Sequence, residues 1–208
     1  MISRTEAEEL LQKDYYSDNF VYLVSEVLFC DFKADKHEVI FSNSLFTEII
    51  QLGISKDCDV TIYEVGLVKG TEKRRVAITQ EMFRVLRGQG INNAVVAFYN
   101  ADKRNYRISL LTSKYEFDGD KIIKILSNPR RFSYTLGYNT KTHTAYKYLI
   151  AGGHVKSLED LISRFSVEVV NKQFYSEIAN CFSELVGGER EGKTFHNIPS
   201  QIILSQIT

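Results

Sequence analysis

Acidic side chains around one apolar segment could hold a divalent cation. Asp59 and Glu64 lie within the stretch DVTIYEVGLV, Glu48 precedes it, and Lys69 follows it directly. Nucleases of the PD-(D/E)XK class use such a set, because carboxylates hold Mg²⁺ and a nearby lysine activates water or stabilises charge on the phosphate. For this chemistry the sequence predicts Glu64, Asp59 and Lys69 as catalytic residues. It predicts Glu64, Asp59 and Glu48 as the Mg²⁺ ligands.

The spacing within this segment favours a structural role for Glu64. Residues alternate between the two faces of an extended strand, so Glu64 and Asp59 point to opposite faces. The nuclease pattern places lysine two positions after the acidic residue, whereas Gly66 occupies that position here. Lys69 would have to reach back from the following loop. Two interpretations stay open: an active or degenerate nuclease centre, or a strand glutamate that is paired with a nearby arginine.

Positive charge is concentrated in the middle of a chain whose formal net charge is zero. Residues 69–147 hold 16 lysines and arginines against 6 acidic residues, while residues 1–40 hold nine acidic residues against four basic ones. A basic central surface with acidic flanks is typical of a protein that faces a polyanion. Random clustering on solvated faces is the alternative interpretation. The asymmetry predicts nucleic acid as a partner.

The central basic residues occur in short clusters beside aromatic residues. Arginine and lysine neutralise phosphates, and aromatic rings can stack on bases or sugars. The predicted DNA-binding residues are Lys73, Arg74, Arg75, Lys103, Arg104, Arg107, Arg130 and Arg131. The aromatic residues between them are Tyr99, Tyr106, Phe132, Tyr134 and Tyr138. Surface hairpins with core aromatics would give the same pattern, and this alternative stays open.

Hydrophobic periodicity and capping residues predict an alternation of helices and strands. Helices are expected over 5–14, 19–29, 44–52 and 79–88, the first capped by Thr5 and the last by Thr79. Strands are expected over 37–42, 59–68, 93–99 and 106–117, and an irregular basic and aromatic segment over 127–148. This order predicts an α/β or α+β fold with a mixed β-sheet flanked by helices. It leaves room for a restriction-endonuclease-like core.

The predicted organisation is one core domain followed by a helical end. Residues 1–157 are expected to form the core with its N-terminal helices, 158–188 a helical tail or joint to a following domain, and 189–208 a weakly ordered end. No apolar run approaches the ~20 residues of a membrane-spanning helix, and the polar N-terminus does not resemble a signal peptide. Dispersed cysteines and histidines offer no metal-binding spacing. These features predict a soluble cytoplasmic protein without a membrane partner.

A longer stretch of the sequence resembles a known protein family. The run IYEVGL…KRRVAITQEMFRVLRGQGINNAVVAFYNADKRNYRISLLT presents a strand with a glutamate, a helix start, an apolar strand and a turn followed by Tyr-Arg-Ile-Ser-Leu. The later SNPRRFSYTLG and RFSVEVVNKQFYSEI fit the same order. Over residues 20–186 this pattern resembles the N-terminal region that precedes the adenine-specific methyltransferase in fused type IIG restriction–modification enzymes.

The resemblance implies a DNA-associated domain of a restriction–modification protein, with a methyltransferase domain as partner in the same chain or in another. Two roles stay open. One is an active or degenerate endonuclease module with Mg²⁺ as cofactor; the other is a non-enzymatic scaffold that packs against a methyltransferase or specificity domain. The sequence contains no glycine-rich cofactor loop and no Asn-Pro-Pro-Tyr-type motif, so this chain by itself is not expected to be a methyltransferase.

Overall fold

The chain divides into two units. The computed structural model describes residues 2–118, 121–127, 132–166, 188–190 and 193–195. The first unit spans Met1–Val167 and the second spans Glu168–Thr208. Within the second unit, β8 (Gly188–Arg190) pairs with β9 (Lys193–Phe195) in antiparallel orientation.

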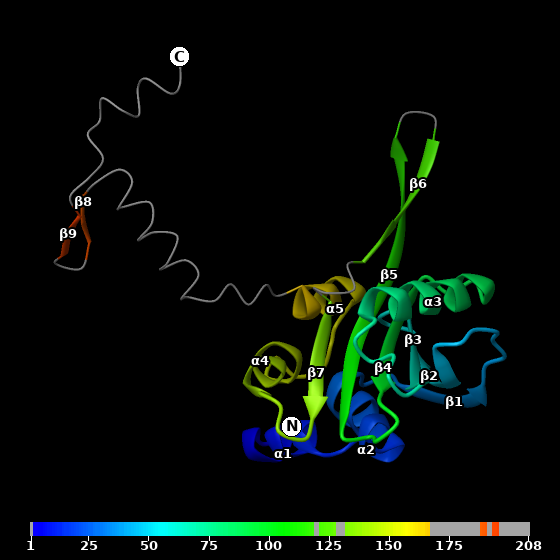
Figure 1. Ribbon diagram of the computed structural model, residues 1–208, viewed down its shortest axis with the longest axis horizontal. Helices are drawn as coiled ribbons and strands as arrows, with labels where there is room; N and C mark the ends of the chain where they lie inside the picture. The colour runs from blue at the N-terminus through cyan, green and yellow to red at the C-terminus, as the bar shows by residue number, and fades with distance from the viewer. Residues whose placement is uncertain (1, 119–120, 128–131, 167–187, 191–192, 196–208) are drawn as a thin grey trace. The chain divides into compact units, whose positions relative to one another are not determined.

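A seven-stranded sheet forms the centre of the first unit (Figure 1). Its strands are β1 (Lys33–Glu38), β2 (Phe46–Ser55), β3 (Val60–Leu67), β4 (Asn93–Tyr99), β5 (Asn105–Asp118), β6 (Lys121–Leu126) and β7 (Ser133–Gly137). They follow the order β1-β2-β3-β4-β5-β6, and β7 pairs with the first part of the long strand β5. β3 and β4 are parallel, and the other neighbours are antiparallel. The predicted α/β fold with a mixed sheet is confirmed, while a restriction-endonuclease-like core stays a prediction.

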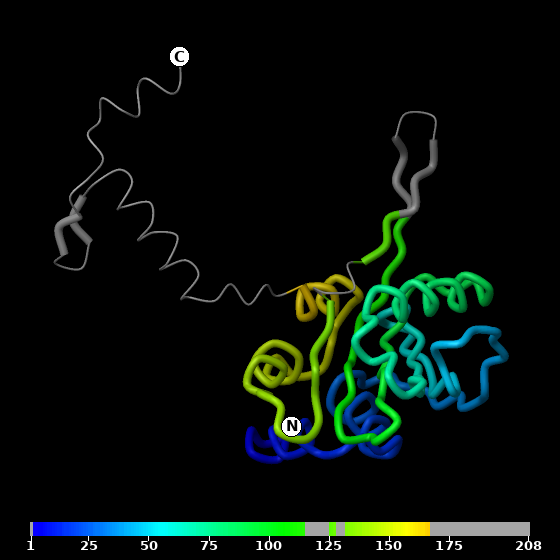
Figure 2. The backbone as a smooth tube through the Cα atoms, viewed as in Figure 1, coloured from blue at the N-terminus to red at the C-terminus, as the bar shows by residue number. Residues whose placement is uncertain are grey.

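Helices cover both faces of the sheet. The helix α3 (Arg75–Gly88) connects the parallel strands β3 and β4 and covers one face, a path that can be followed in Figure 2. The other face is covered by α1 (Arg4–Gln12), α2 (Ser17–Tyr22), α4 (His143–Ala145), α5 (Leu158–Phe165) and two π-helical segments, η1 (Leu23–Leu28) and η2 (Tyr146–Ile150).

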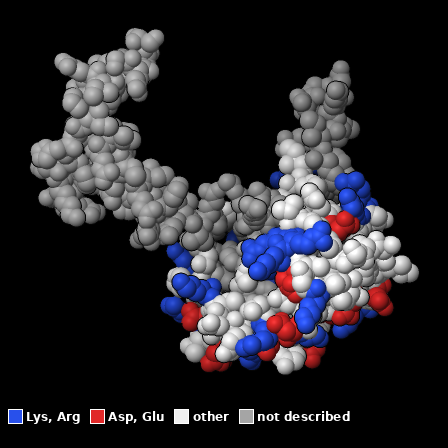
Figure 3. Space-filling view, viewed as in Figure 1, with Lys and Arg blue, Asp and Glu red and all other residues white. Residues whose placement is uncertain are grey.

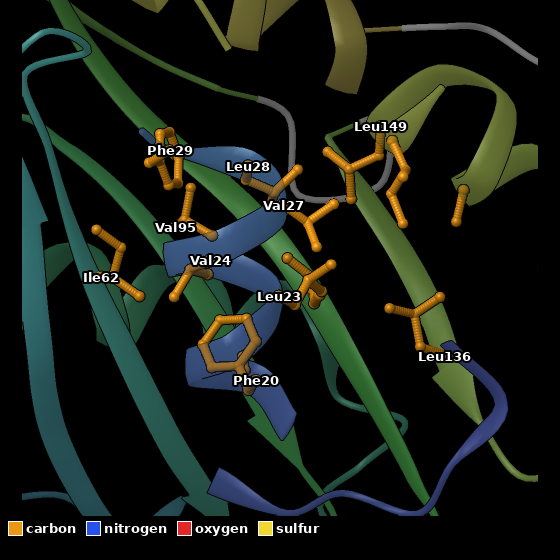
Figure 4. Packing of buried hydrophobic residues seen from close by; sticks show 14 of the residues in the cluster. Phe20, Leu23, Val24, Val27, Leu28, Phe29, Ile62, Val95, Leu136 and Leu149 are labelled. Atoms are coloured by element: carbon orange, nitrogen blue, oxygen red, sulfur yellow. The ribbon is translucent and has the colours of Figure 1, made fainter. Parts of the chain in front are cut away.

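The central strands contribute side chains to a hydrophobic core on each face. Ile62 and Val95 pack with Phe20 and the η1 segment in one core, which Figure 4 shows at close range. Tyr63 and Val96, the next residues along the same strands, belong to the core beneath α3. Because consecutive strand residues point to opposite faces, strands that are covered on both sides must be apolar almost throughout. The near-continuous apolarity of β3 and β4 follows from this arrangement.

The helix predicted over 44–52 is wrong, because this segment forms the strand β2. Asn43 precedes this strand, and its Oδ1 accepts two backbone N–H groups, at 2.9 and 3.0 Å, in the turn that leads into it. Gly53, just past the predicted helix, lies within the strand, where a Cβ atom would approach the Lys33 carbonyl oxygen to 2.3 Å. The missing side chain of Gly53 thus permits the close approach of β1 to β2.

Two predicted helix starts are displaced. The helix expected over 5–14 exists as α1, but Ser3 caps it and exchanges reciprocal hydrogen bonds with Glu6 in a capping box. The predicted cap at Thr79 is wrong, because α3 already begins at Arg75 and Thr79 is buried within it. At α1 the sequence offers two candidate capping boxes, while α3 begins without a side-chain cap.

The remaining predicted elements agree with the structure to differing degrees. The strands expected over 59–68, 93–99 and 106–117 and the helix expected over 19–29 are confirmed, with their ends shifted. The strand expected over 37–42 is displaced, because β1 ends at Glu38. The segment 127–148 is not irregular throughout: Ser133–Gly137 forms β7 against β5.

The chain beyond the sheet is described only in part. The helix α5 belongs to the first unit, since its Leu161 and Phe165 lie in the core. The rest of the predicted helical tail, over 167–187, lies outside the described residues, as does most of the predicted end at 189–208. Within the described part of the chain, no helix is both long and apolar enough to cross a membrane.

Candidate functional site

The carboxyl ends of β3 and β4 meet at one edge of the sheet, because these strands are parallel neighbours. Gly66 of β3 pairs there with Tyr99 of β4. Residues 68–75 lead from this edge into α3, and residues 100–107 form the turn after β4 and the first residues of β5. Together these two segments, here called the basic edge, contain seven lysines and arginines and two acidic residues. Open α/β sheets commonly bind ligands just outside the carboxyl ends of their parallel strands.

The start of α3 adds to the positive potential of the basic edge. Arg74 at its N-cap makes no side-chain capping hydrogen bond, and the first turn contains no acidic residue. The first N–H groups of a helix have no acceptor within the helix, and the helix dipole makes this end positive. Lysine and arginine side chains gather over this region of the surface in Figure 3. The start of α3 therefore favours a bound anion.

A cavity of about 200 Å³ lies at the basic edge. Its lining residues are Leu67, Glu72, Lys73, Arg75, Phe98, Asn100, Asn105, Tyr106, Arg107 and Thr135. Three of them are cationic and one, Glu72, is acidic. The Glu72 carboxylate accepts the backbone N–H of Gly70 at 3.0 Å. This space, the Arg107 cavity, therefore has an excess of positive charge.

Arg107 is buried in the wall of this cavity without a polar partner for one end of its guanidinium. Only 7% of the residue is exposed, and its Nη1 has no hydrogen-bond partner. The guanidinium carbon lies 5.0 Å from the centre of the Phe98 ring, on the neighbouring strand. Burial, followed by the charge of nearby Arg75, lowers the pKa of Arg107 to about 10. The side chain of Asn105, which also lines the cavity, has a buried Oδ1 without a partner.

The other predicted DNA-binding residues divide into an exposed group and a pair outside the described residues. Lys73, Arg74, Arg75, Lys103 and Arg104 are all exposed at the basic edge. The turn that carries Lys103 is fixed from the other side, because its carbonyl oxygen accepts the Tyr15 N–H at 2.6 Å. The remaining two, Arg130 and Arg131, lie outside the described residues.

Most of the aromatic residues near the basic clusters are part of the core. Tyr99 and Tyr106 are each 6% exposed, so their rings are not free to stack on bases. Phe132 and Tyr134 are partly buried against the same core. Tyr138 is the exception at 56% exposure, and the Arg104 guanidinium lies 4.2 Å from its ring centre. The alternative of surface hairpins with core aromatics therefore describes most of these rings.

Glu64 is enclosed beneath the N-terminal segment. Its exposed fraction is 4%, and its Oε2 accepts the Tyr15 hydroxyl proton at 2.7 Å. Glu48, on the neighbouring strand β2, accepts the hydroxyl proton of Tyr99. The rings of Tyr15 and Tyr99 are stacked with their centres 4.5 Å apart. Burial is the main cause that raises the pKa of both tyrosines, so each hydroxyl keeps its proton for the carboxylate.

The other residues proposed for metal and phosphate chemistry lie at opposite ends of β3. Asp59 is exposed before the strand and its Oδ2 accepts the Asn93 side-chain N–H at 3.1 Å. Lys69 is exposed after the strand, which at ~3.3 Å per residue is about 26 Å long. Lys36 pairs with the buried carboxylate, with its Nζ 4.0 Å from Glu64 Oε1.

Of the predicted Mg²⁺ ligands, Glu48 and Glu64 lie on the neighbouring strands β2 and β3, while Asp59 precedes β3, and the Mg²⁺ site stays a prediction. Glu48 and Glu64 are each bound by a tyrosine hydroxyl, and Asp59 is bound elsewhere. Among the described residues, no three His, Cys, Asp or Glu side chains form a group that could hold a metal ion.

Sequence reasoning missed several residues of this region. Asn105 and Thr135 line the Arg107 cavity, and Tyr15 binds Glu64. Asn105 stands beside a predicted turn, which is a usable signal. Thr135 lies on a strand that the sequence did not reveal. Tyr15 is 49 positions from Glu64 along the chain, and nothing local in the sequence links the two.

Comparisons with known proteins add no identification. Neither protein-family models, nor curated proteins, nor solved structures gave a match to this chain.

Proposed function

We propose that this chain is a DNA-associated domain of a restriction–modification protein, acting in the cytoplasm beside a methyltransferase. In this proposal the basic edge lies against the phosphate backbone, and the exposed lysines and arginines neutralise phosphates. The restriction–modification context, including the methyltransferase partner, rests on the resemblance of the sequence.

The observation that carries the proposal is the collection of basic residues at one edge of the sheet. Six of the eight predicted DNA-binding residues lie there: Lys73, Arg74, Arg75, Lys103, Arg104 and Arg107. They come from two segments that are separated in the sequence by α3 and β4. The parallel pairing of β3 and β4 brings these segments together, but a chain that merely distributed its charges over solvated faces would have no reason to make both of them basic beside an uncapped helix start.

Binding without cleavage is the role that the surroundings of Glu64 favour. A catalytic carboxylate must reach the metal and the scissile phosphate. The Glu64 carboxylate is instead buried and hydrogen-bonded to Tyr15. Its burial supports the non-enzymatic alternative, in which the domain binds DNA and packs against a methyltransferase or specificity domain.

DNA binding should depend steeply on salt. Each phosphate contact that is lost lowers the slope of log K against log salt by about 0.9, so Arg74→Gln, Lys103→Gln and Arg104→Gln together should reduce the slope by roughly 2–3. Fluorescence anisotropy of a labelled duplex, titrated between about 50 and 200 mM salt, measures this slope. None of these three residues lines the Arg107 cavity.

The matched control removes the same charge elsewhere. Lys13, Lys33 and Lys56 are exposed and lie outside the basic edge. Their joint replacement by glutamine should leave the slope within the error of the wild type. Equal losses from the two triple variants would show that general charge, rather than the basic edge, determines binding.

The isolated chain should not cut DNA. Incubation of supercoiled plasmid with the protein and Mg²⁺ is expected to leave the plasmid intact, because Glu64 is enclosed. Gel electrophoresis of the plasmid checks this. Robust Mg²⁺-dependent cleavage that disappears in Glu64→Ala would contradict the proposed role and establish the nuclease alternative.

A further inference from the structure

The Arg107 cavity has the features of a site built for one small anion. Arg107 is 93% buried and its Nη1 has no hydrogen-bond partner, although this side chain lines an open space. Within the described part of the chain, Arg107 forms no ion pair with an acidic side chain. Lys73 and Arg75 line the same cavity beside the start of α3.

This arrangement of charges is unfavourable for the free energy of the folded protein when the Arg107 cavity holds no anion. A buried charge without a counter-charge is costly, because it has lost its hydration and gained no partner. A second cation worsens the cost, since Arg75 adds like charge near Arg107. Buried polar groups in native proteins are nearly always paired, and an exception calls for an explanation. An anion in the cavity would supply the missing counter-charge.

We propose that the Arg107 cavity binds the phosphate group of a phosphomonoester. Arginine is suited to this ligand because its planar fork of N–H donors matches phosphate oxygens. The uncapped first turn of α3 supplies further donors and a favourable dipole at the same place. The polar lining residues Asn100, Asn105 and Thr135 can contact the remaining oxygens or the attached group.

The depth of Arg107 selects a terminal phosphate over an internal one. An internal phosphodiester is held by the nucleic-acid chain on both sides and stays at the surface, where exposed Lys73 and Arg74 can reach it. A monoester is linked on one side only, so it can enter a recess. It also carries close to two negative charges near neutral pH, which better balances two arginines. The ligand could be the 5′ end of a DNA strand or a free nucleotide; both present the same group.

This inference goes beyond the proposed function, since phosphate binding does not require DNA binding. The direct probe is inorganic phosphate, titrated into the full chain by isothermal calorimetry at constant ionic strength with chloride as the balancing anion. We expect saturable binding of one phosphate to the wild-type protein. Arg107→Met should weaken it by about tenfold or more, and Arg75→Gln by about fivefold, because charge-assisted hydrogen bonds to phosphate are lost. Arg84→Gln, on the same helix but outside the cavity, should bind as the wild type does.

Unfolding measurements separate a binding role from a structural one. If Arg107 serves a ligand, Arg107→Met should leave the phosphate-free protein as stable as the wild type or more stable, because an unpaired buried charge has been removed. If Arg107 holds the fold together, the variant should unfold at lower urea concentration. Loss of stability without saturable phosphate binding by the wild type would overturn the proposal.

Oligonucleotides distinguish the two sources of the ligand. Tighter binding of a 5′-phosphorylated strand than of its 5′-hydroxyl counterpart, abolished by Arg107→Met, would support a DNA end. Equal binding of both strands, together with saturable binding of adenosine monophosphate, would support a free nucleotide. Should phosphate bind while duplex DNA does not, the proposed function fails and this inference stands. The absence of saturable binding of every phosphate compound would refute the inference alone.

Discussion

Arg164→Met is expected to lower the free energy of unfolding by about 3 kcal/mol or more, because it removes a fully used guanidinium from the interior. Arg164 is 8% exposed, and its donors reach five acceptors at 2.6 to 3.1 Å. Two are the carboxylate oxygens of Asp160, and three are the carbonyl oxygens of Leu149, Gly153 and His154. The side chain thereby ties α5 to η2 and to the residues that follow η2. Urea unfolding monitored by circular dichroism measures the loss.

The pH dependence of this loss gives a second measurement. The hydrogen bond from Arg164 is the main cause that lowers the pKa of Asp160. A carboxylate whose pKa is depressed in the folded state adds stability above its unfolded pKa of ~3.9, and this contribution disappears as the pH falls through the lower folded value. The difference in stability between wild type and Arg164→Met should therefore narrow below about pH 4.

Arg84→Met is the matched control. The Arg84 side chain is 70% exposed and pairs with Glu81 one turn away on α3. Exposed pairs of this kind contribute about 0.5 kcal/mol or less, so the variant should unfold almost as the wild type does. An equally small loss of unfolding free energy in both variants would contradict this prediction. It would mean that water hydrogen-bonds to the acceptors that Arg164 leaves behind.

The sequence predicted β3 and β4 because both faces of these strands lie against cores, and β5 as the hairpin partner of β4. Apolar side chains such as Ile62 and Tyr63 follow one another along β3. A short, nearly continuous apolar run of this kind is typical of a strand that is buried on both faces. The same logic gave the α/β fold class. It did not give the N-terminal cap of α1, where Ser3 with Glu6 and a second pair two residues later, Thr5 with Glu8, both match the capping-box spacing.

The strand β2 was predicted as a helix because of irregularities in its pairing. Phe46, Ile49, Ile50 and Gly53 stand at positions i, i+3, i+4 and i+7, the spacing of one helix face. The pairing of β2 with β3 shifts register between Phe46 and Glu48 and again between Gln51 and Gly53. Such bulges interrupt the alternation that would otherwise identify a strand. A single sequence does not reveal where a neighbouring strand imposes them.

The sequence predicted the positive charge of the candidate site, but it did not predict that Arg107 is buried. The clusters around Arg74 and Arg104 meet at the basic edge because they follow two parallel strands, a consequence of the strand–helix–strand order. The burial of Arg107 depends on Phe98 beside it and on Thr135 of β7 across from it. Since β7 was not recognised, Arg107 was predicted as one more surface cation.

Gly137→Ala should be the most damaging of the conservative glycine substitutions, with a loss of about 3 kcal/mol in unfolding free energy. The backbone of Gly137 has a φ of +106°, a value that residues other than glycine rarely adopt. A Cβ atom there would lie 2.3 Å from the carbonyl oxygen of Arg104, and backbone atoms cannot rotate away. The same oxygen accepts the Tyr138 N–H at 2.8 Å, so relief of the clash would break this bond at the basic edge.

Two other glycines separate the causes of this loss. Gly153 has a φ of +72°, and no atom lies within 4 Å of the place that a Cβ would take, so Gly153→Ala should cost only the ~1 kcal/mol of backbone strain. Gly88 ends α3 in open space without a positive φ, so Gly88→Ala should be neutral or stabilising by up to about 1 kcal/mol. In urea unfolding, Gly88→Ala should therefore be the most stable of the three variants, Gly153→Ala less stable, and Gly137→Ala the least stable. A Gly137→Ala protein as stable as Gly153→Ala would mean that the turn into β5 yields freely, and that the basic edge is less firmly fixed than its hydrogen bonds imply.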